Sequence, residues 1–297
     1  MIEQRNHEIV FSNLVNDTFL ILELTEEGKV LDANKRFLAL TRFTLDEIIT
    51  LDYQELTTGC LEELSEVLDK ARLGEKSQGE NRFITKCGDV KWLESTFIPI
   101  MAADGSVEKI LTLHQDITDV KLAAQWKRLA YHNELTGLPN RRSLYDAMDL
   151  HIWRAQQMDG QFAVLFMDLN RFKSVNDQYG HRTGDQLIIE IGRRLSIMPY
   201  TNYGLFHMSG DEFIILIEDS ANLDAIIKEI LTIFEKGFSS IISYLNVSVS
   251  IGISLFPEHA TNPEQLIELA DRAMYEAKSS THNEYRFADE SIVTLRK

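Results

Sequence analysis

The stretch GLFHMSGDEFIILI, residues 204–217, places two acidic residues between two apolar runs. Two apolar runs, residues 204–208 and 213–217, flank the polar turn Ser209-Gly210-Asp211-Glu212 and predict a β-hairpin. Two carboxylates at such a turn are costly to bury without a partner, so the two acids either face solvent or bind cations. The hairpin by itself leaves both interpretations open.

A third apolar run lies upstream and ends in another acid. Residues 162–167, FAVLFM, form a continuous apolar segment typical of a buried central strand, and Asp168 closes it. Asp168, Asp211 and Glu212 together offer the oxygen ligands that Mg²⁺ prefers, with positions left for substrate phosphates. The segment that follows has polar residues and glycines at spacings that suggest a nucleotide cradle: Asn176, Asp177, Gly180, His181, Gly184 and Asp185.

Further blocks surround these residues in a fixed order. They are LTGLPNR at 135–141, FK at 172–173, ND at 176–177, YGH at 179–181, GD at 184–185, SGDEF at 209–213, SVSIGI at 248–253 and ADRAMYEAK at 270–278. With these blocks in this order, residues 129–286 resemble throughout a GGDEF domain, the diguanylate cyclase family. The resemblance implies a mixed central sheet of about five strands flanked by helices.

The same resemblance implies a metal site and a catalytic pair. The ligands of Mg²⁺ or Mn²⁺ would be Asp168, Asp211, Glu212 and the carbonyl of Leu169, and both metals suit oxygen ligands. Asp211 and Glu212 would also be the catalytic residues. Attack of one GTP 3′-hydroxyl on the α-phosphate of another would release pyrophosphate, and two such steps give cyclic di-GMP. Because each domain binds one GTP, two domains must face each other.

The resemblance also implies which residues bind the nucleotide. Asn176 and Asp185 would contact the guanine edge, because a carboxylate accepts from guanine N–H groups that adenine lacks. The triphosphate would lie against the backbone near Phe172 and Lys173, with Lys278 as a point charge. Gly210 completes the expected substrate-binding set.

Several positions depart from the family pattern. Ser209 stands where the signature has its first glycine, His282 where an arginine is frequent, Asn133 and Asn170 where aspartates are common, and Arg171 where an apolar residue is frequent. These exchanges put turnover in question more than GTP binding. The family's inhibitory product motif, Arg-x-x-Asp, is replaced by Tyr200-Thr201-Asn202-Tyr203, so we expect no inhibitory product site of that type.

The first third of the chain has a different pattern. Strand-like runs at residues 19–24 and 29–34 precede short helices, and three further runs follow at 80–87, 91–101 and 107–115. This order, closing in Asp116-Ile117-Thr118, resembles a PAS sensor domain over roughly residues 5–118, which implies a five-stranded antiparallel sheet with short helices. Residues 44–73 contain no histidine to ligate haem, so haem is disfavoured. Flavin stays open because Trp92 could line a pocket, although a Trp in a core strand more often serves packing alone. A small apolar ligand, or no ligand at all, fits equally well.

A helix is predicted between the two regions, from Asp119 to about His132. Leu122, Trp126, Leu129 and Asn133 follow spacings of four and three, which is a short a/d stripe. The stripe fits a parallel coiled coil between two copies of the chain. It fits equally a single amphipathic helix packed on its own domain.

Composition limits the class of protein. The 297 residues contain 46 acidic and 30 basic side chains, which gives a net charge of −16. This charge excludes binding of nucleic acid or anionic lipid through a broad positively charged surface. The two cysteines, Cys60 and Cys87, are too few for a disulfide framework or a zinc site. No run approaches the roughly 18–20 apolar residues of a membrane-spanning helix, and the N-terminus lacks a signal peptide. We therefore expect a soluble, cytoplasmic protein.

Together these observations predict an α+β chain with a PAS domain at 1–118, a linker helix at 119–133 and a GGDEF domain at 134–297. The predicted function is that of a diguanylate cyclase regulated by the PAS domain and acting as a homodimer through the linker helix and PAS domain. The alternative is a catalytically weak, GTP-binding GGDEF domain that regulates a downstream EAL phosphodiesterase in a longer chain. A purely structural dimerisation module would leave the acidic residues and Lys278 unexplained.

Overall fold

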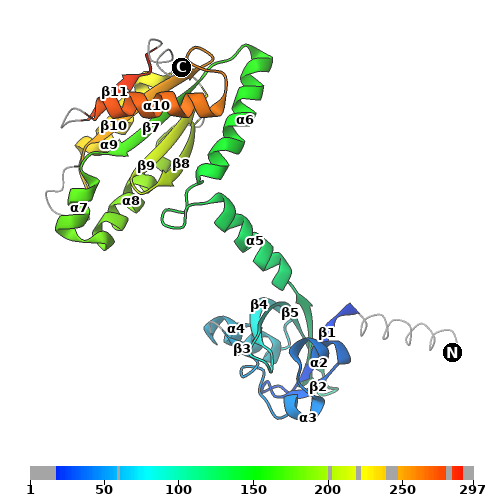
Figure 1. Ribbon diagram of the computed structural model, residues 1–297. Coiled ribbons are helices and arrows are strands. Elements are labelled where there is room, and N and C mark those ends of the chain that lie inside the picture. The colour runs from blue at the N-terminus through cyan, green and yellow to red at the C-terminus, as the bar shows by residue number, and fades with distance from the viewer. Residues whose placement is uncertain are drawn as a thin grey trace. The chain divides into compact units, whose positions relative to one another are not determined.

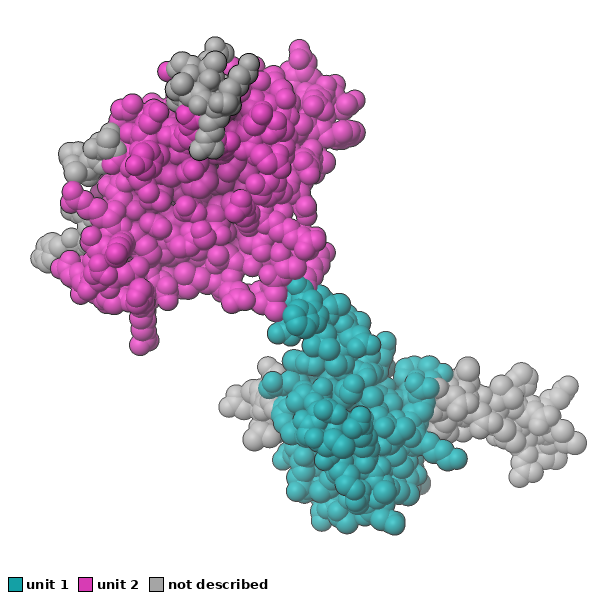
Figure 2. Space-filling model, in the orientation of Figure 1, with its two compact units in different colours: residues 1–126 teal, residues 127–297 magenta. Residues whose placement is uncertain are grey.

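The computed structural model describes residues 18–58, 61–199, 203–218, 222–238, 247–278 and 283–289 (Figure 1). Expectations for Cys60, residues 200–202, His282 and residues 290–297 lie outside this part of the chain. The chain divides into two compact units, residues 1–126 and 127–297, coloured separately in Figure 2. No helix in the described ranges is long and apolar enough to cross a membrane.

The first unit is built on an antiparallel sheet of strand order β2-β1-β6-β5-β4-β3. Its elements are β1 (Leu20–Leu24), β2 (Val30–Ala33), α2 (Lys35–Thr41), α3 (Leu45–Ile48), β3 (Thr57–Thr58), α4 (Leu61–Arg72), β4 (Ser77–Ile84), β5 (Val90–Met101) and β6 (Val107–Asp116). The five predicted strands are present. The two-residue β3 is a sixth, too short to show an alternating sequence pattern.

The core of this unit is a cluster of aromatic rings around His114. Phe37, Tyr53, Phe83 and Phe97 are fully buried, and the first three have ring centroids 5.3–6.1 Å from the His114 ring. The imidazole is also buried, and its ring nitrogens hydrogen-bond to Ser95 Oγ (2.7 Å) and Thr112 Oγ1 (2.8 Å). Burial lowers the pKa of His114 to about 3, so the ring is neutral.

The second unit has a mixed sheet of strand order β11-β10-β7-β9-β8. Its elements are α6 (Arg141–Met158), β7 (Phe162–Leu169), α7 (Phe172–Tyr179), α8 (His181–Ser196), β8 (Tyr203–Ser209), β9 (Glu212–Ile217), α9 (Leu223–Glu235), β10 (Val249–Phe256), α10 (Pro263–Ala277) and β11 (Glu284–Phe287). Only the β10–β11 pair is parallel. The predicted hairpin is present as β8 and β9.

Strand β7 lies at the centre of this sheet, and all eight of its residues are buried. Successive side chains of a strand point to opposite faces. Ala163, Leu165 and Met167 accordingly join the core beneath α8 and α9, whereas Val164 and Phe166 join the core beneath α6 and α10. The apolar run of residues 162–167 was therefore correctly predicted to be a central strand, and its end places Asp168 at one edge of the sheet.

Helix α5 (Thr118–Tyr131) connects the sheet of the first unit to the start of the second. Leu122, Trp126 and Leu129 are exposed, Trp126 at 67%. Asn133, predicted as the fourth member of the stripe, lies beyond the helix in the turn that follows. Its side-chain oxygen accepts hydrogen bonds from the backbone N–H groups of Leu135 and Thr136, a local bond that competes with helix formation.

Candidate active site

Acidic residues gather where β7 ends and β9 begins. Asp168 pairs with Glu212 across the two strands, so these side chains lie on the same face of the sheet. Asp168 is 6% exposed, and its Oδ2 lies 2.8 Å from Nζ of Lys278, the residue after α10. Burial raises the pKa of Asp168 to about 6, with a further upward contribution from Asp211, while the Lys278 ammonium opposes the shift.

The turn between β8 and β9 holds the other two acids. Burial raises the pKa of Asp211, with the charge of Glu212 acting in the same direction. Glu212 Oε2 accepts a hydrogen bond of 2.8 Å from Ser209 Oγ. Ser209 is thus accommodated where the family pattern has glycine, and its hydroxyl holds the neighbouring carboxylate. Gly210 has a φ of +52°, in the left-handed region that glycine tolerates best.

One further acid near this cluster escaped sequence reasoning. Asp271 on α10 has its pKa raised by burial and by the charge of Glu212, while Lys278 lowers it. Its place in the ADRAMYEAK block was the only available signal. Within the described ranges, no three His, Cys, Asp or Glu side chains already converge as a metal cage. Lys278 supplies a positive charge beside Asp168.

The nucleotide-binding candidates lie on α7 and α8. Helix α7 begins three residues after β7 ends, with Phe172 half-buried and Lys173 exposed at its start. Asn176 Oδ1 is buried and has no hydrogen-bond partner among the described residues. A Cβ added to Gly184 would lie 1.9 Å from that oxygen, so α8 packs directly against the Asn176 side chain. Asp185, the next residue, is exposed.

In the structure, the predicted site residues therefore lie in two groups. Asp168, Asp211, Glu212 and Lys278 interact with one another at the sheet edge. Phe172 and Asn176 contact the Gly184 position on the helices that follow β7, with Asp185 adjacent in the chain. The Leu169 carbonyl lies between the two groups in sequence, at the last residue of β7.

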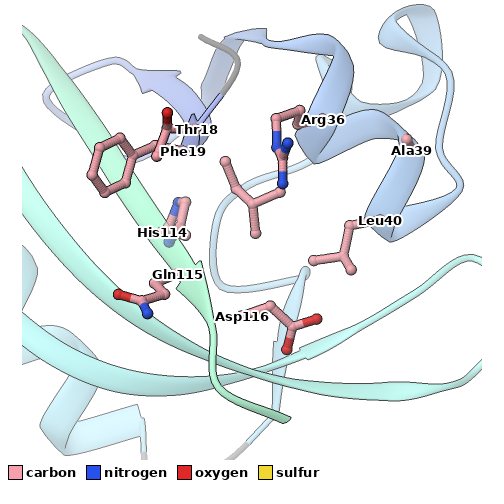
Figure 3. A pocket seen from close by; sticks show the side chains of 9 residues that line it. Thr18, Phe19, Arg36, Ala39, Leu40, His114, Gln115 and Asp116 are labelled. Atoms are coloured by element: carbon pink, nitrogen blue, oxygen red, sulfur yellow. The ribbon is translucent and has the colours of Figure 1, made fainter. Parts of the chain in front are cut away.

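The first unit has a cavity of about 760 Å³, shown in Figure 3. Arg36 and Leu40, from α2, lie across it from Gln115 and Asp116, at the end of β6. The other lining residues are Thr18, Phe19, Leu20, Ala39 and His114. Asp116 Oδ1 also accepts a hydrogen bond from the N–H of Thr118, the first residue of α5. His114 belongs to β6, outside the segment of residues 44–73 that lacks histidine.

Comparison with known proteins identifies both regions. A family model described as "Diguanylate cyclase, GGDEF domain" matches residues 130–284, and a PAS domain model matches residues 16–119. The chain belongs to the GGDEF family. Its GGDEF domain follows a PAS domain, so both predicted resemblances are confirmed.

Two curated relatives illustrate the likeness. Signaling protein YkoW of Bacillus subtilis is 31% identical over 298 residues, which cover 98% of this chain and 36% of YkoW. The bifunctional diguanylate cyclase/cyclic di-GMP phosphodiesterase MucR of Pseudomonas aeruginosa is 38% identical over 167 residues, which cover 56% of this chain and 24% of MucR. The chain thus spans about a third or less of the length of these relatives.

A solved structure shows the same fold in the GGDEF domain. Diguanylate cyclase SiaD of Pseudomonas aeruginosa, in complex with its activator SiaC, is 26% identical to this chain, with a TM-score of 0.51. The match covers 57% of this chain and 65% of that chain.

Proposed function

We propose that the chain is a diguanylate cyclase that condenses two GTP into cyclic di-GMP and two pyrophosphates. In each of two steps a 3′-hydroxyl oxygen bonds to the α-phosphorus of the other nucleotide, the bond to pyrophosphate breaks, and the hydroxyl proton is released. The observation that carries this proposal is the gathering of Asp168, Asp211, Glu212 and Lys278 at one sheet edge, beside the helices of Asn176 and Asp185.

The acidic residues fit a divalent metal by their donor chemistry. Mg²⁺ and Mn²⁺ prefer carboxylate and carbonyl oxygens, which Asp168, Asp211, Glu212 and Leu169 supply. The raised pKa values of Asp168 and Asp211 show that burial disfavours their ionised forms, a cost that a nearby cation offsets. Such a metal, when bound, would neutralise phosphate charge in the reaction.

The nucleotide would be held by the second group of residues. Asn176 Oδ1 is a buried acceptor without a hydrogen-bond partner in the described part of the chain, and such a group favours a ligand that donates a hydrogen bond to it. The guanine edge supplies N–H donors to Asn176 and Asp185. The triphosphate would contact the start of α7 at Phe172 and Lys173, the Gly210 backbone and the Lys278 ammonium.

The reaction needs two copies of the domain, because each would hold one GTP. The exposed side chains of Leu122, Trp126 and Leu129 on α5 offer an apolar surface for pairing two copies in parallel. Signals from the PAS domain would reach the GGDEF domain through the same helix. The exposed apolar side chains of α5 and its place between the two domains support a homodimer whose activity the PAS domain regulates.

Turnover of GTP by the purified chain tests the proposal. We expect cyclic di-GMP and pyrophosphate to form from GTP with Mg²⁺ or Mn²⁺, as measured by chromatography. Asp211→Asn keeps the side-chain volume and removes the charge, so it should lower the rate at least about 100-fold. Asp224→Asn, on the exposed first turn of α9, is the matched control and should retain the rate.

A GTP-binding regulatory domain is the second candidate. It is supported by two relatives whose names include a cyclic di-GMP phosphodiesterase, MucR and PdeR of Escherichia coli, which are 38% and 35% identical to this chain over 167 and 173 residues. In that case the domain would bind GTP and control a phosphodiesterase in a longer chain. GTP binding without turnover at high protein concentration would favour this candidate over the cyclase.

A further inference from the structure

His207 occupies a buried position between the acidic turn and the first turn of the GGDEF domain. It lies on β8, two residues before Ser209, and is 1% exposed. Its ring stacks on Phe213 of β9, with the ring centroids 4.6 Å apart and the planes 12° from parallel. A buried histidine must satisfy both ring nitrogens, so its partners show which segments it joins.

The two nitrogens of His207 bond to two different turns. Nε2 lies 3.1 Å from the carbonyl oxygen of Gly210, and Nδ1 lies 3.0 Å from Oγ1 of Thr136. A carbonyl can only accept, so Nε2 carries the proton and Nδ1 of the neutral ring accepts from the Thr136 hydroxyl. One tautomer therefore satisfies both contacts. Burial lowers the pKa of His207, in agreement with a neutral ring.

The Thr136 side of this contact leads directly to the end of α5. The N–H of His207 donates to the carbonyl of Pro139 (2.9 Å), which fastens β8 to the same turn. Asn140, which follows Pro139, donates from its backbone N–H to Tyr131 and from its side chain to Ala130, both in the last turn of α5. Hydrogen bonds thus connect α5, the turn at residues 132–140, His207 and Gly210 without a break.

We infer that His207 is a positioning residue that couples the C-terminal end of α5 to the turn at residues 209–212. The inference rests on the proposed function, in which that turn holds substrate and metal. The Gly210 carbonyl belongs to the peptide that joins Gly210 to Asp211. Holding this oxygen restrains the plane of that peptide, and with it the positions of the N and Cα atoms of Asp211. A shift of the turn at residues 132–140 would therefore move the acidic turn.

The coupling is tested by removing one hydroxyl far from the acidic turn in sequence. In the full chain without nucleotide, Thr136→Val should speed hydrogen exchange of the amides of residues 210–213 by about two- to tenfold, the factor expected for one neutral hydrogen bond. Thr136→Ser keeps the hydroxyl and should restore the exchange rates of the unmutated chain. Thr232→Val is the matched control, because among the described residues the Thr232 hydroxyl bonds only within α9, to the Lys228 carbonyl.

Two results would overturn the inference. One is exchange at residues 210–213 that Thr136→Val leaves unchanged. The other is a rise of equal size throughout β7, β9 and β10, because uniform acceleration indicates general destabilisation and not a specific contact. Thr136→Ser separates a hydrogen-bonding role of Thr136 from a space-filling role. If only the serine variant, which keeps the hydroxyl, exchanges like the unmutated chain, the hydroxyl is what matters.

The same exchange experiment with added GTP separates this inference from the proposed function. GTP with Mg²⁺ should slow exchange at residues 133–139 in the unmutated chain, and His207→Phe, which keeps a ring on Phe213 but loses both hydrogen bonds, should abolish that protection while GTP still binds. If protection persists in His207→Phe, the coupling through His207 is wrong. If the unmutated chain binds no GTP, the proposed function fails, and the nucleotide-free comparison at Thr136 still decides the coupling.

Discussion

At the scale of single residues, the site is defined by a buried acid whose charge is only partly compensated. Asp168 is 6% exposed, and the 2.8 Å ion pair with Lys278 does not keep its pKa at the ordinary value, because burial raises it to about 6. A protein keeps such a group at a cost in stability. The cost is expected where the acid serves binding or catalysis.

This cost predicts the effect of Asp168→Asn on folding. The pKa of Asp168 is higher in the folded state than the ordinary value of 3.8, so its contribution to stability is fully present below pH 3.8 and is lost as the pH rises through about 6. At pH 7 without metal, Asp168→Asn should raise the free energy of unfolding by about 1–3 kcal/mol, with a smaller gain near pH 4. Urea unfolding in a chelator at both pH values measures this. A variant less stable than the unmutated chain at pH 7 would contradict it.

The contact between α7 and α8 predicts the effect of a single methyl group. In Gly184→Ala the new Cβ would meet Asn176 Oδ1 at 1.9 Å and Phe172 Cζ at 3.1 Å, so either the Asn176 side chain must turn away or the two helices must separate. We expect a loss of about 1–3 kcal/mol in the free energy of unfolding and at least about tenfold weaker GTP binding. Gly160→Ala is the control, because its Cβ would meet nothing closer than 3.5 Å. Equal GTP affinity in Gly184→Ala and the unmutated chain would contradict the proposed place of guanine.

Sequence reasoning found the acids more readily than their partners. Asp168, Asp211 and Glu212 stand at the ends of apolar runs, a local signal that survives without knowledge of the fold. The Lys278 ion pair, the Asp271 contribution and the Thr136 contact of His207 join segments between 59 and 110 residues apart along the chain. No local pattern encodes these contacts, because they depend on how α10 and the turn at residues 132–140 pack on the sheet.

At the scale of elements, α5 belongs to both units, since residues 118–126 lie in the first and residues 127–131 in the second. The sequence predicted its existence and its apolar side chains correctly. The predicted stripe included one residue too many. Asn133 lies beyond the end of α5, and its side chain accepts hydrogen bonds from the backbone of the following turn. The two-residue β3 was missed because strands so short carry no periodicity.

The proposed pairing through α5 predicts the effect of a charge on its exposed face. Trp126→Glu places a carboxylate where Trp126 is 67% exposed, and a second copy would have to bury that charge. We expect self-association to weaken at least about tenfold and the specific rate of cyclic di-GMP formation to fall with it. Sedimentation over a range of protein concentrations measures the change. Trp153→Glu, on an exposed position of α6, is the matched control, and equal weakening by both variants would contradict pairing through α5.

At the scale of the whole molecule, an acidic chain is proposed to handle an anionic substrate. The net charge of −16 opposes a polyphosphate at long range, so GTP must be held by local features. In the proposed function these features are Lys173 and Lys278, the backbone around Gly210 and α7, and a divalent metal at the acidic residues. Along the chain, the hydrogen-bonded turn at residues 132–140 follows the PAS domain and α5 and precedes the residues of this site.

The measurement that tests the central claim most directly is the mass of the product formed from an equal mixture of unlabelled and ¹⁵N-labelled GTP with Mg²⁺. A cyclase that joins two separate GTP molecules must yield cyclic di-GMP in three masses, with the half-labelled form the most abundant. We predict that pattern for the unmutated chain and its loss in Asp211→Asn. A product containing a single guanine, or no cyclic dinucleotide while GTP remains bound, would contradict the account.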